Sequence, residues 1–163
     1  MIHFVSQGQY LWHDIRKSTP YVVIPNVVVP LEKSPLGTKT AGVIGSIDRF
    51  KQTHLSIERA LGKVYNKILL YGNVTDREYF EKEVSPYVSK GVAILMGHVD
   101  DRQKMYDSVD EVFHSSVMET YNFIRAECHY TGVKYDGLES ANTDAELWTS
   151  DKIFEKWNEV FNG

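Results

Sequence analysis

Short continuous apolar runs alternate with helical patterns along the chain, and this alternation restricts the folds that it can adopt. The runs at 67–71 and 92–96 each stop at a glycine. Such runs between helical segments are typical of parallel strands that are covered on both faces. We expect strands over 3–6, 21–24, 41–47, 67–71, 92–96, 111–114 and 133–135, and helices over 7–17, 53–64, 76–84, about 101–106, 122–131 and 151–161. The pattern predicts a Rossmann-like, doubly wound α/β fold with a parallel sheet.

Local signals fix several of these helix boundaries. Asp76 is expected to cap one helix, and Pro86 is expected to end or kink it. Asp100 or Asp101 is expected to cap the short helix that carries Met105 and Tyr106. At 163 residues the chain is long enough for one domain with a full-sized core, so we treat 1–163 as a single domain.

The net charge, the lengths of the apolar runs and the cysteine content argue against several classes of protein. The net charge of −4 argues against a general nucleic-acid binder. The sequence has no apolar run long enough to span a bilayer, and its start lacks the basic residues of a secretory signal. The single cysteine, Cys128, suits a reducing compartment and is expected to be a buried thiol. We therefore expect a cytoplasmic protein, and peripheral contact with a membrane stays open.

Two carboxylates, Glu119 and Glu127, flank the predicted start of the helix over 122–131. The first N–H groups of a helix have no partner within it and favour an anion such as phosphate. Glu119 would lie beside that anion. Glu127, one turn into the helix, would face a neutral group rich in hydroxyls, because a carboxylate accepts hydrogen bonds from hydroxyls and repels phosphate. The arrangement predicts a site for a nucleotide diphosphate sugar.

The segment 119–127 resembles the retaining, nucleotide-sugar-dependent glycosyltransferases of the GT-B fold (glycosyl transferases group 1). The residues before it, 106–113, and those after it, Tyr130-Thr-Gly-Val133, share in this resemblance. The resemblance covers about 25–133 and is to their C-terminal, donor-binding domain. It implies transfer of a glycosyl group from a UDP-, GDP- or ADP-sugar to an unknown acceptor with retention, without a metal or other cofactor. It also implies that 1–25 is hinge-proximal, that an N-terminal acceptor domain is missing, and that the chain alone is inactive.

The loop after the third predicted strand is the first candidate for binding this donor. Gly45 would let the backbone approach the ligand closely, and Arg49 and Lys51 would neutralise a diphosphate. The resemblance matches Lys51 to the family's catalytic lysine. It also places Ser46 where an arginine is usual, so either Arg49 supplies that charge from a different direction or the chain binds phosphate less tightly.

Residues after the strand over 92–96 form the second candidate. By the resemblance, the backbone of Gly97, His98 and Val99 contacts the nucleotide base, and Val99 and Met105 wall it. On the sequence alone, without the resemblance, these residues are best explained as a strand-ending turn with a surface histidine.

The resemblance gives roles to the segment between the two glutamates. Glu119 lies by the donor sugar and leaving phosphate and, with Lys51, is expected to be catalytic. The amides around Thr120, Tyr121, Asn122 and Phe123 hold the sugar and diphosphate. Glu127 binds the ribose hydroxyls. Asn122 stands where glycine is common.

Two other function classes stay open on the sequence. One is a catalytically inactive Rossmann-like interaction module, for which Ser46 and Asn122 are the best support. The other is a phospho-acceptor signalling domain, for which Asp48 lacks the acidic partners. The sequence has no Gly-x4-Gly-Lys, no Gly-x-Gly-x-x-Gly and no Asp-x-Asp, and its six histidines show no metal-ligand spacing.

Overall fold

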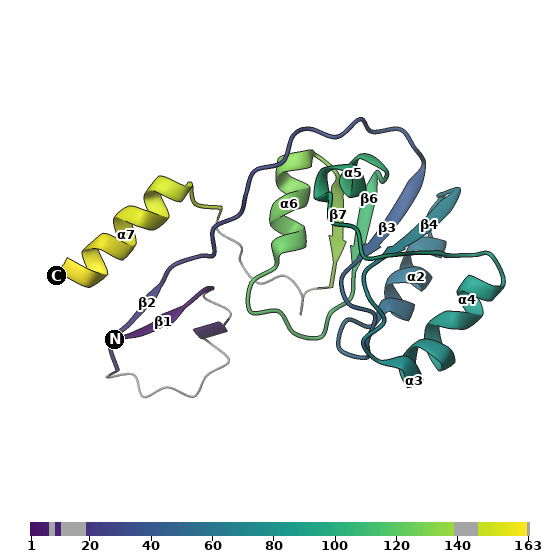
Figure 1. Cartoon of the computed structure of the whole chain (residues 1–163), viewed down its shortest axis with the longest axis horizontal. Coiled ribbons are helices and arrows are strands. Elements are labelled where there is room, and N and C mark those ends of the chain that lie inside the picture. The colour runs from purple at the N-terminus through teal and green to yellow at the C-terminus, as the bar shows by residue number, and fades with distance from the viewer. Residues whose placement is uncertain (7–8, 11–18, 139–146, 163) are drawn as a thin grey trace.

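A five-stranded parallel sheet forms the centre of the protein in a computed structural model, which describes residues 1–6, 9–10, 19–138 and 147–162 (Figure 1). The strand order is β5-β4-β3-β6-β7. The bounds are Thr40–Ile44 for β3, Lys67–Tyr71 for β4, Ile94–Gly97 for β5, Glu111–His114 for β6 and Lys134–Gly137 for β7. All neighbouring strands in this sheet run parallel, so their carboxyl ends lie along one edge.

Helices cover both faces of this sheet. On one face, α2 (Thr53–Leu61) and the π-helical turn η1 (Phe80–Val84) pack against the sheet through a core that includes Ile57 and Val84. On the other face, α5 (Arg102–Asp107) and α6 (Phe123–Thr131) contribute Met105, Tyr106 and Cys128 to a second core. Successive strand residues point to opposite faces, so Leu69 and Leu70 of β4 enter different cores. The doubly wound α/β fold predicted from the sequence is confirmed.

Capping residues begin the helices where the sequence indicated. Asp76 accepts a hydrogen bond from the N–H of Tyr79 at 3.1 Å, and Asp101 accepts one from the N–H of Lys104 at 3.1 Å. These bonds satisfy N–H groups that have no partner within the helix. The predicted caps of both helices are confirmed, and Asp101 rather than Asp100 caps α5.

The helical path continues past Pro86, which contradicts one of the two outcomes predicted there, an end of the helix. It runs through α3 (Arg77–Tyr79), η1 and α4 (Ser85–Ser89), so Pro86 does not end it. Pro86 lies in the first turn of α4. Proline is tolerated in the first turn of a helix, where its fixed φ suits the helical conformation.

A second, two-stranded parallel sheet lies beside the main one and consists of β1 (Ile2–Phe4) and β2 (Tyr21–Val23). The C-terminal helix α7 (Ser150–Asn162) lies against it, with the rings of His3 and Trp157 4.5 Å apart (Figure 1). The helix predicted over 7–17 falls largely outside the described residues. Within the described chain, no helix has the length and apolar character needed to cross a bilayer.

Candidate functional site

A cavity of about 340 Å³ opens at the carboxyl edge of the main sheet. The segments that follow β3, β4 and β5 form part of its wall, and α5 and α6 contribute the rest. Ligands of open parallel α/β sheets bind at this edge, where strand order reverses. The lining residues are Ile44, Gly45, Ser46, Tyr71, Gly72, Asn73, Thr75, His98, Val99, Arg102, Met105 and Glu127.

Close backbone contact between the β3 and β4 loops shapes one wall of this cavity. Gly72 has a φ of 140°, a backbone conformation that residues with a side chain rarely adopt. A Cβ atom at this position would lie 1.9 Å from the carbonyl oxygen of Gly45. The N–H of Gly45 donates to the carbonyl of Tyr71 at 2.9 Å, and the N–H of Gly72 donates to that of Gly97 at 2.8 Å. Only glycine at position 72 allows the loops to meet in this way.

Glu127 enters the cavity as a buried carboxylate whose two oxygens both have partners. The residue is 5% exposed. Its Oε1 accepts from Nη1 of Arg102 at 2.5 Å, and its Oε2 accepts from the hydroxyl of Tyr106 at 2.8 Å. Each carboxylate oxygen has capacity for another hydrogen bond. The arrangement therefore presents a fixed acceptor to a ligand that donates hydroxyl hydrogens.

A second cluster joins the two residues that the sequence predicted to be catalytic. One oxygen of Glu119 accepts hydrogen bonds from Nζ of Lys51 and from Nε2 of His114, the latter at 2.8 Å. Burial raises the pKa of Glu119, but the hydrogen bonds from His114 and Lys51 outweigh it and bring the pKa to about 2. Glu119 is therefore ionised at neutral pH. None of these three residues lines the cavity that holds Glu127.

Asp48 organises the loop that carries Lys51. Its carboxylate accepts from the N–H groups of Phe50 and Lys51, both at 2.9 Å, and from the hydroxyl of Ser46 at 2.6 Å. Burial raises the pKa of Asp48, but these hydrogen bonds leave it below its usual range. Ser46 thus supplies a structural hydrogen bond at the position where the resemblance suggests an arginine.

Arg49 lies away from the other predicted site residues. Its side chain is 59% exposed and pairs with Asp76 at 2.6 Å. It lines a different cavity, together with Glu78 and Lys82. The structure therefore brings Lys51, and not Arg49, to Glu119.

The segment between the two glutamates forms the entry to α6. The side-chain oxygen of Asn122 accepts from the N–H of Arg125 at 2.9 Å, and its amide donates to the hydroxyl of Tyr135 at 2.7 Å. The carbonyl of Thr120 accepts from the hydroxyl of Ser6 at 2.6 Å. Tyr121 is buried in a small apolar cluster with Val28 and Ala126. None of the predicted residues Thr120, Tyr121, Asn122 and Phe123 lines the cavity that holds Glu127, and the hydrogen bonds of this segment hold the loop ahead of α6.

Phe123 begins α6 and is partly exposed, with its ring 5.0 Å from that of Tyr121. The remaining predicted residues Gly97, His98, Val99 and Met105 lie at the end of β5 and on α5. His98, Val99 and Met105 line the cavity, and Gly97 adopts a φ of 73° next to it. The structure thus places the predicted base-binding residues on the wall that also carries Arg102.

Sequence reasoning missed Arg102, Tyr106 and His114. Arg102 and Tyr106 are four residues apart on α5, so they lie on the same face of the helix. This spacing was the signal in the sequence that both could contact one partner, which is Glu127. His114 is the last residue of β6. Its position at the carboxyl end of a predicted strand, where ligands of such sheets bind, could have indicated that it belongs to the site.

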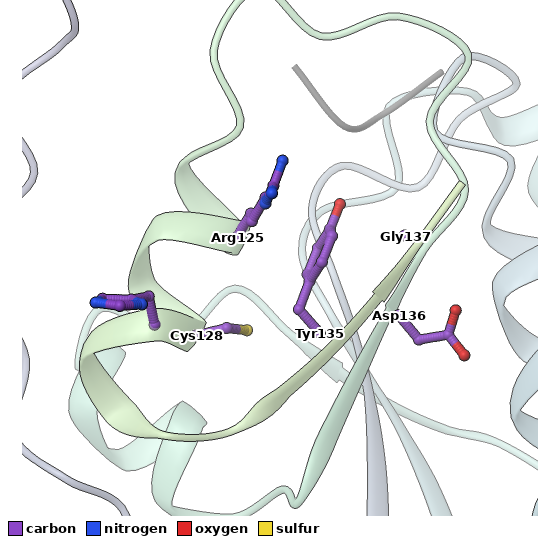
Figure 2. A pocket seen from close by; sticks show the side chains of 6 residues that line it. Arg125, Cys128, Tyr135, Asp136 and Gly137 are labelled. Atoms are coloured by element: carbon purple, nitrogen blue, oxygen red, sulfur yellow. The ribbon is translucent and has the colours of Figure 1, made fainter. Parts of the chain in front are cut away.

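A further cavity, of about 410 Å³, lies between α6 and β7 (Figure 2). Arg125, Cys128, Tyr135 and Asp136 are among its lining residues. Burial raises the pKa of the Cys128 thiol, so the thiolate is disfavoured and the thiol is unreactive. The expectation of a buried Cys128 is confirmed. Among the residues that the structure describes, no group of three His, Cys, Asp or Glu side chains is arranged to hold a metal ion.

Comparisons with known proteins show similarity at the level of structure. No protein-family model and no curated protein matches the chain. A single-residue mutant of TarM from S. aureus, solved with fondaparinux, alpha-GlcNAc-glycerol and UDP, matches with a TM-score of 0.70 at 17% identity. That match covers 99% of this chain and 43% of TarM.

Two further solved structures support the same conclusion. The pneumococcal O-GlcNAc transferase GtfA, in complex with UDP and GlcNAc, matches with a TM-score of 0.66 at 15% identity over 96% of this chain and 42% of GtfA. The C-terminal domain of LpcC, a glycosyl transferase group 1 family protein from Francisella tularensis, matches with a TM-score of 0.55 at 18% identity over 76% of this chain and 75% of that domain. The chain spans less than half the length of TarM and GtfA. It therefore has the Rossmann-like α/β fold of GT-B glycosyltransferases.

Proposed function

We propose that the chain binds a nucleotide diphosphate sugar, with UDP as the nucleotide, and serves as the donor-binding part of a retaining glycosyltransferase. The observation that carries the proposal is Glu127, a buried carboxylate held by Arg102 and Tyr106 in the wall of a cavity at the sheet edge. The choice of UDP rests on the complexes of TarM and GtfA, which were solved with UDP.

The cavity divides into regions of different chemistry. His98, Val99 and Met105 offer a partly apolar wall on which a flat base packs. Glu127 accepts hydrogen bonds from the ribose hydroxyls. Gly45, without a side chain, lets the diphosphate approach the backbone of the β3 loop. The N-terminus of α6 lies outside the cavity lining, and we propose that its N–H groups and dipole favour the anionic part of the ligand that extends beyond the cavity.

The Lys51, Glu119 and His114 cluster is proposed to act on the sugar and the leaving phosphate. Because the pKa of Glu119 is about 2, this carboxylate has no proton to donate at neutral pH. It accepts hydrogen bonds from sugar hydroxyls and opposes positive charge that develops on the sugar. Lys51 and the α6 amides stabilise the diphosphate as the glycosidic bond breaks. In this proposal the protein's own cations and amides carry the charge without a metal.

Isothermal titration calorimetry with UDP, GDP and ADP, and then with the corresponding sugar conjugates, tests the proposal. We expect a preference for UDP and at least a tenfold loss of affinity in Glu127→Gln, which keeps the shape of the side chain and removes its charge. Glu81→Gln is the matched control, because Glu81 is exposed and lies on η1. Equal affinity of wild type and Glu127→Gln would contradict the proposal.

A nonenzymatic interaction module remains the second candidate, favoured by one observation. The Ser46 hydroxyl is engaged by Asp48 and contributes no positive charge to the cavity. Failure of the wild-type chain to bind any of the three nucleotides or their sugar conjugates would support this candidate over the first.

A further inference from the structure

Arg102 occupies a position that the sequence reasoning did not anticipate. It is the first residue of α5, directly after the capping residue Asp101, and its side chain lines the cavity. That side chain is 43% exposed, whereas its partner Glu127 is only 6% exposed at the side chain. One end of the ion pair is therefore buried and the other faces open space.

The charges around the cavity single out this residue. Among the described residues that line it, Arg102 is the one arginine or lysine and Glu127 is the one carboxylate. Lys51 lies outside this lining and pairs with Glu119, and Arg49 pairs with Asp76 beside another cavity. An anion that enters the cavity therefore meets Arg102 as the only arginine or lysine on its described walls.

We propose that Arg102 is a nucleotide-binding residue whose guanidinium is shared between Glu127 and the phosphate oxygens of the bound nucleotide. The inference rests on the proposed function. Arginine carries five N–H donors in a planar fork, and the contact with Glu127 engages Nη1. The side chain is 43% exposed and lines the cavity, so donors that do not contact Glu127 are available to a phosphate that enters it.

The surroundings of Arg102 prepare it for this role. Glu127 holds the guanidinium in place before the ligand arrives, which reduces the side-chain freedom lost on binding. Tyr106 holds the other oxygen of Glu127 at 2.8 Å, so the carboxylate keeps its orientation when Arg102 turns part of its fork to phosphate. The ribose and the phosphates are thereby bound by two side chains that fix one another.

Comparing ligands with and without phosphate separates this role from simple positioning of Glu127. We would measure the affinities of uridine, UMP and UDP by NMR titration for wild type, Arg102→Gln and Arg102→Lys. For Arg102→Gln we expect uridine affinity within about twofold of wild type and UDP affinity at least tenfold weaker. Arg102→Lys keeps the charge and lacks the fork, so we expect an intermediate loss for UDP alone. Arg77→Gln, at an exposed residue of α3, is the control for the change in net charge.

The outcomes distinguish the inference from the function on which it rests. Equal losses for uridine and UDP would show that Arg102 only positions Glu127 and would overturn the inference. Unchanged UDP affinity in Arg102→Gln would overturn it as well, while leaving the proposed function intact. Absence of UDP binding by the wild type would overturn both. If Arg102→Gln does not fold, as judged by circular dichroism, Arg102→Lys provides the same comparison.

Discussion

Neutralising Glu119 should change how the stability of the protein depends on pH. The pKa of Glu119 lies at about 2 in the folded protein, against an ordinary value of 4.5. A difference of one pKa unit corresponds to about 1.4 kcal/mol, so ionised Glu119 contributes about 3 kcal/mol to folding at neutral pH. The pKa is depressed on folding, so this contribution is present above pH 4.5 and is lost as the pH falls toward 2.

The variant Glu119→Gln isolates this contribution, because a glutamine of the same size does not titrate. At pH 5 almost all of the stabilisation remains, whereas at pH 3 about 1.4 kcal/mol is left. We therefore expect the free energy of unfolding of wild type to fall by about 2 kcal/mol more than that of Glu119→Gln between these two pH values.

Urea denaturation of both proteins, followed by tryptophan fluorescence at pH 5 and pH 3, provides the measurement. Glu81→Gln serves as the control, because Glu81 is exposed and the same change there should leave the pH dependence as in wild type. If the unfolding free energies of wild type and Glu119→Gln fall in parallel between pH 5 and pH 3, the ion-pair cluster does not hold Glu119 as described.

Three further perturbations test other parts of the account. Gly72→Ala should destabilise the protein by several kcal/mol in thermal unfolding and abolish UDP binding, because its Cβ would collide with the backbone of the β3 loop. Gly91→Ala is the control: Gly91 has a φ of 70° and no atom within 4 Å of the new Cβ, so this change should cost only about 1 kcal/mol. Tyr106→Phe should cost about 1 to 3 kcal/mol of stability and weaken UDP binding in calorimetry, because it removes a buried hydrogen bond to Glu127; unchanged stability would argue against that bond. His114→Gln should weaken the affinity for a UDP-sugar more than that for UDP, because His114 holds Glu119, which we propose to lie beside the sugar; equal losses would contradict that role.

Most strands of the main sheet were predictable because they are short, largely apolar runs bounded by residues that end them, whereas β7, with the sequence Lys-Tyr-Asp-Gly, lacks this signal. The runs at 67–71 and 111–114 form β4 and β6 with the predicted bounds. The third strand was predicted over 41–47 and ends at Ile44, since Gly45 takes a φ of 131° that breaks the strand. Local signals of this kind are visible in the sequence.

The site was only partly predictable, because its ion pairs join residues that are distant in sequence. The position of Glu127 one turn into a helix was visible, but its partner Arg102 comes from a different helix. The pairing of Arg49 with Asp76 spans 27 residues and removes Arg49 from the cavity, which no local pattern indicates. Spacing thus located the two carboxylates, and tertiary packing decided which cations meet them.

A crystal structure of the protein with UDP tests the central claim most directly. We predict that UDP occupies the cavity at the sheet edge, with its ribose hydroxyls on Glu127, its base against Val99 and Met105, and its diphosphate beside Gly45. UDP bound elsewhere on the protein, or bound in this cavity with its ribose away from Glu127, would contradict the account.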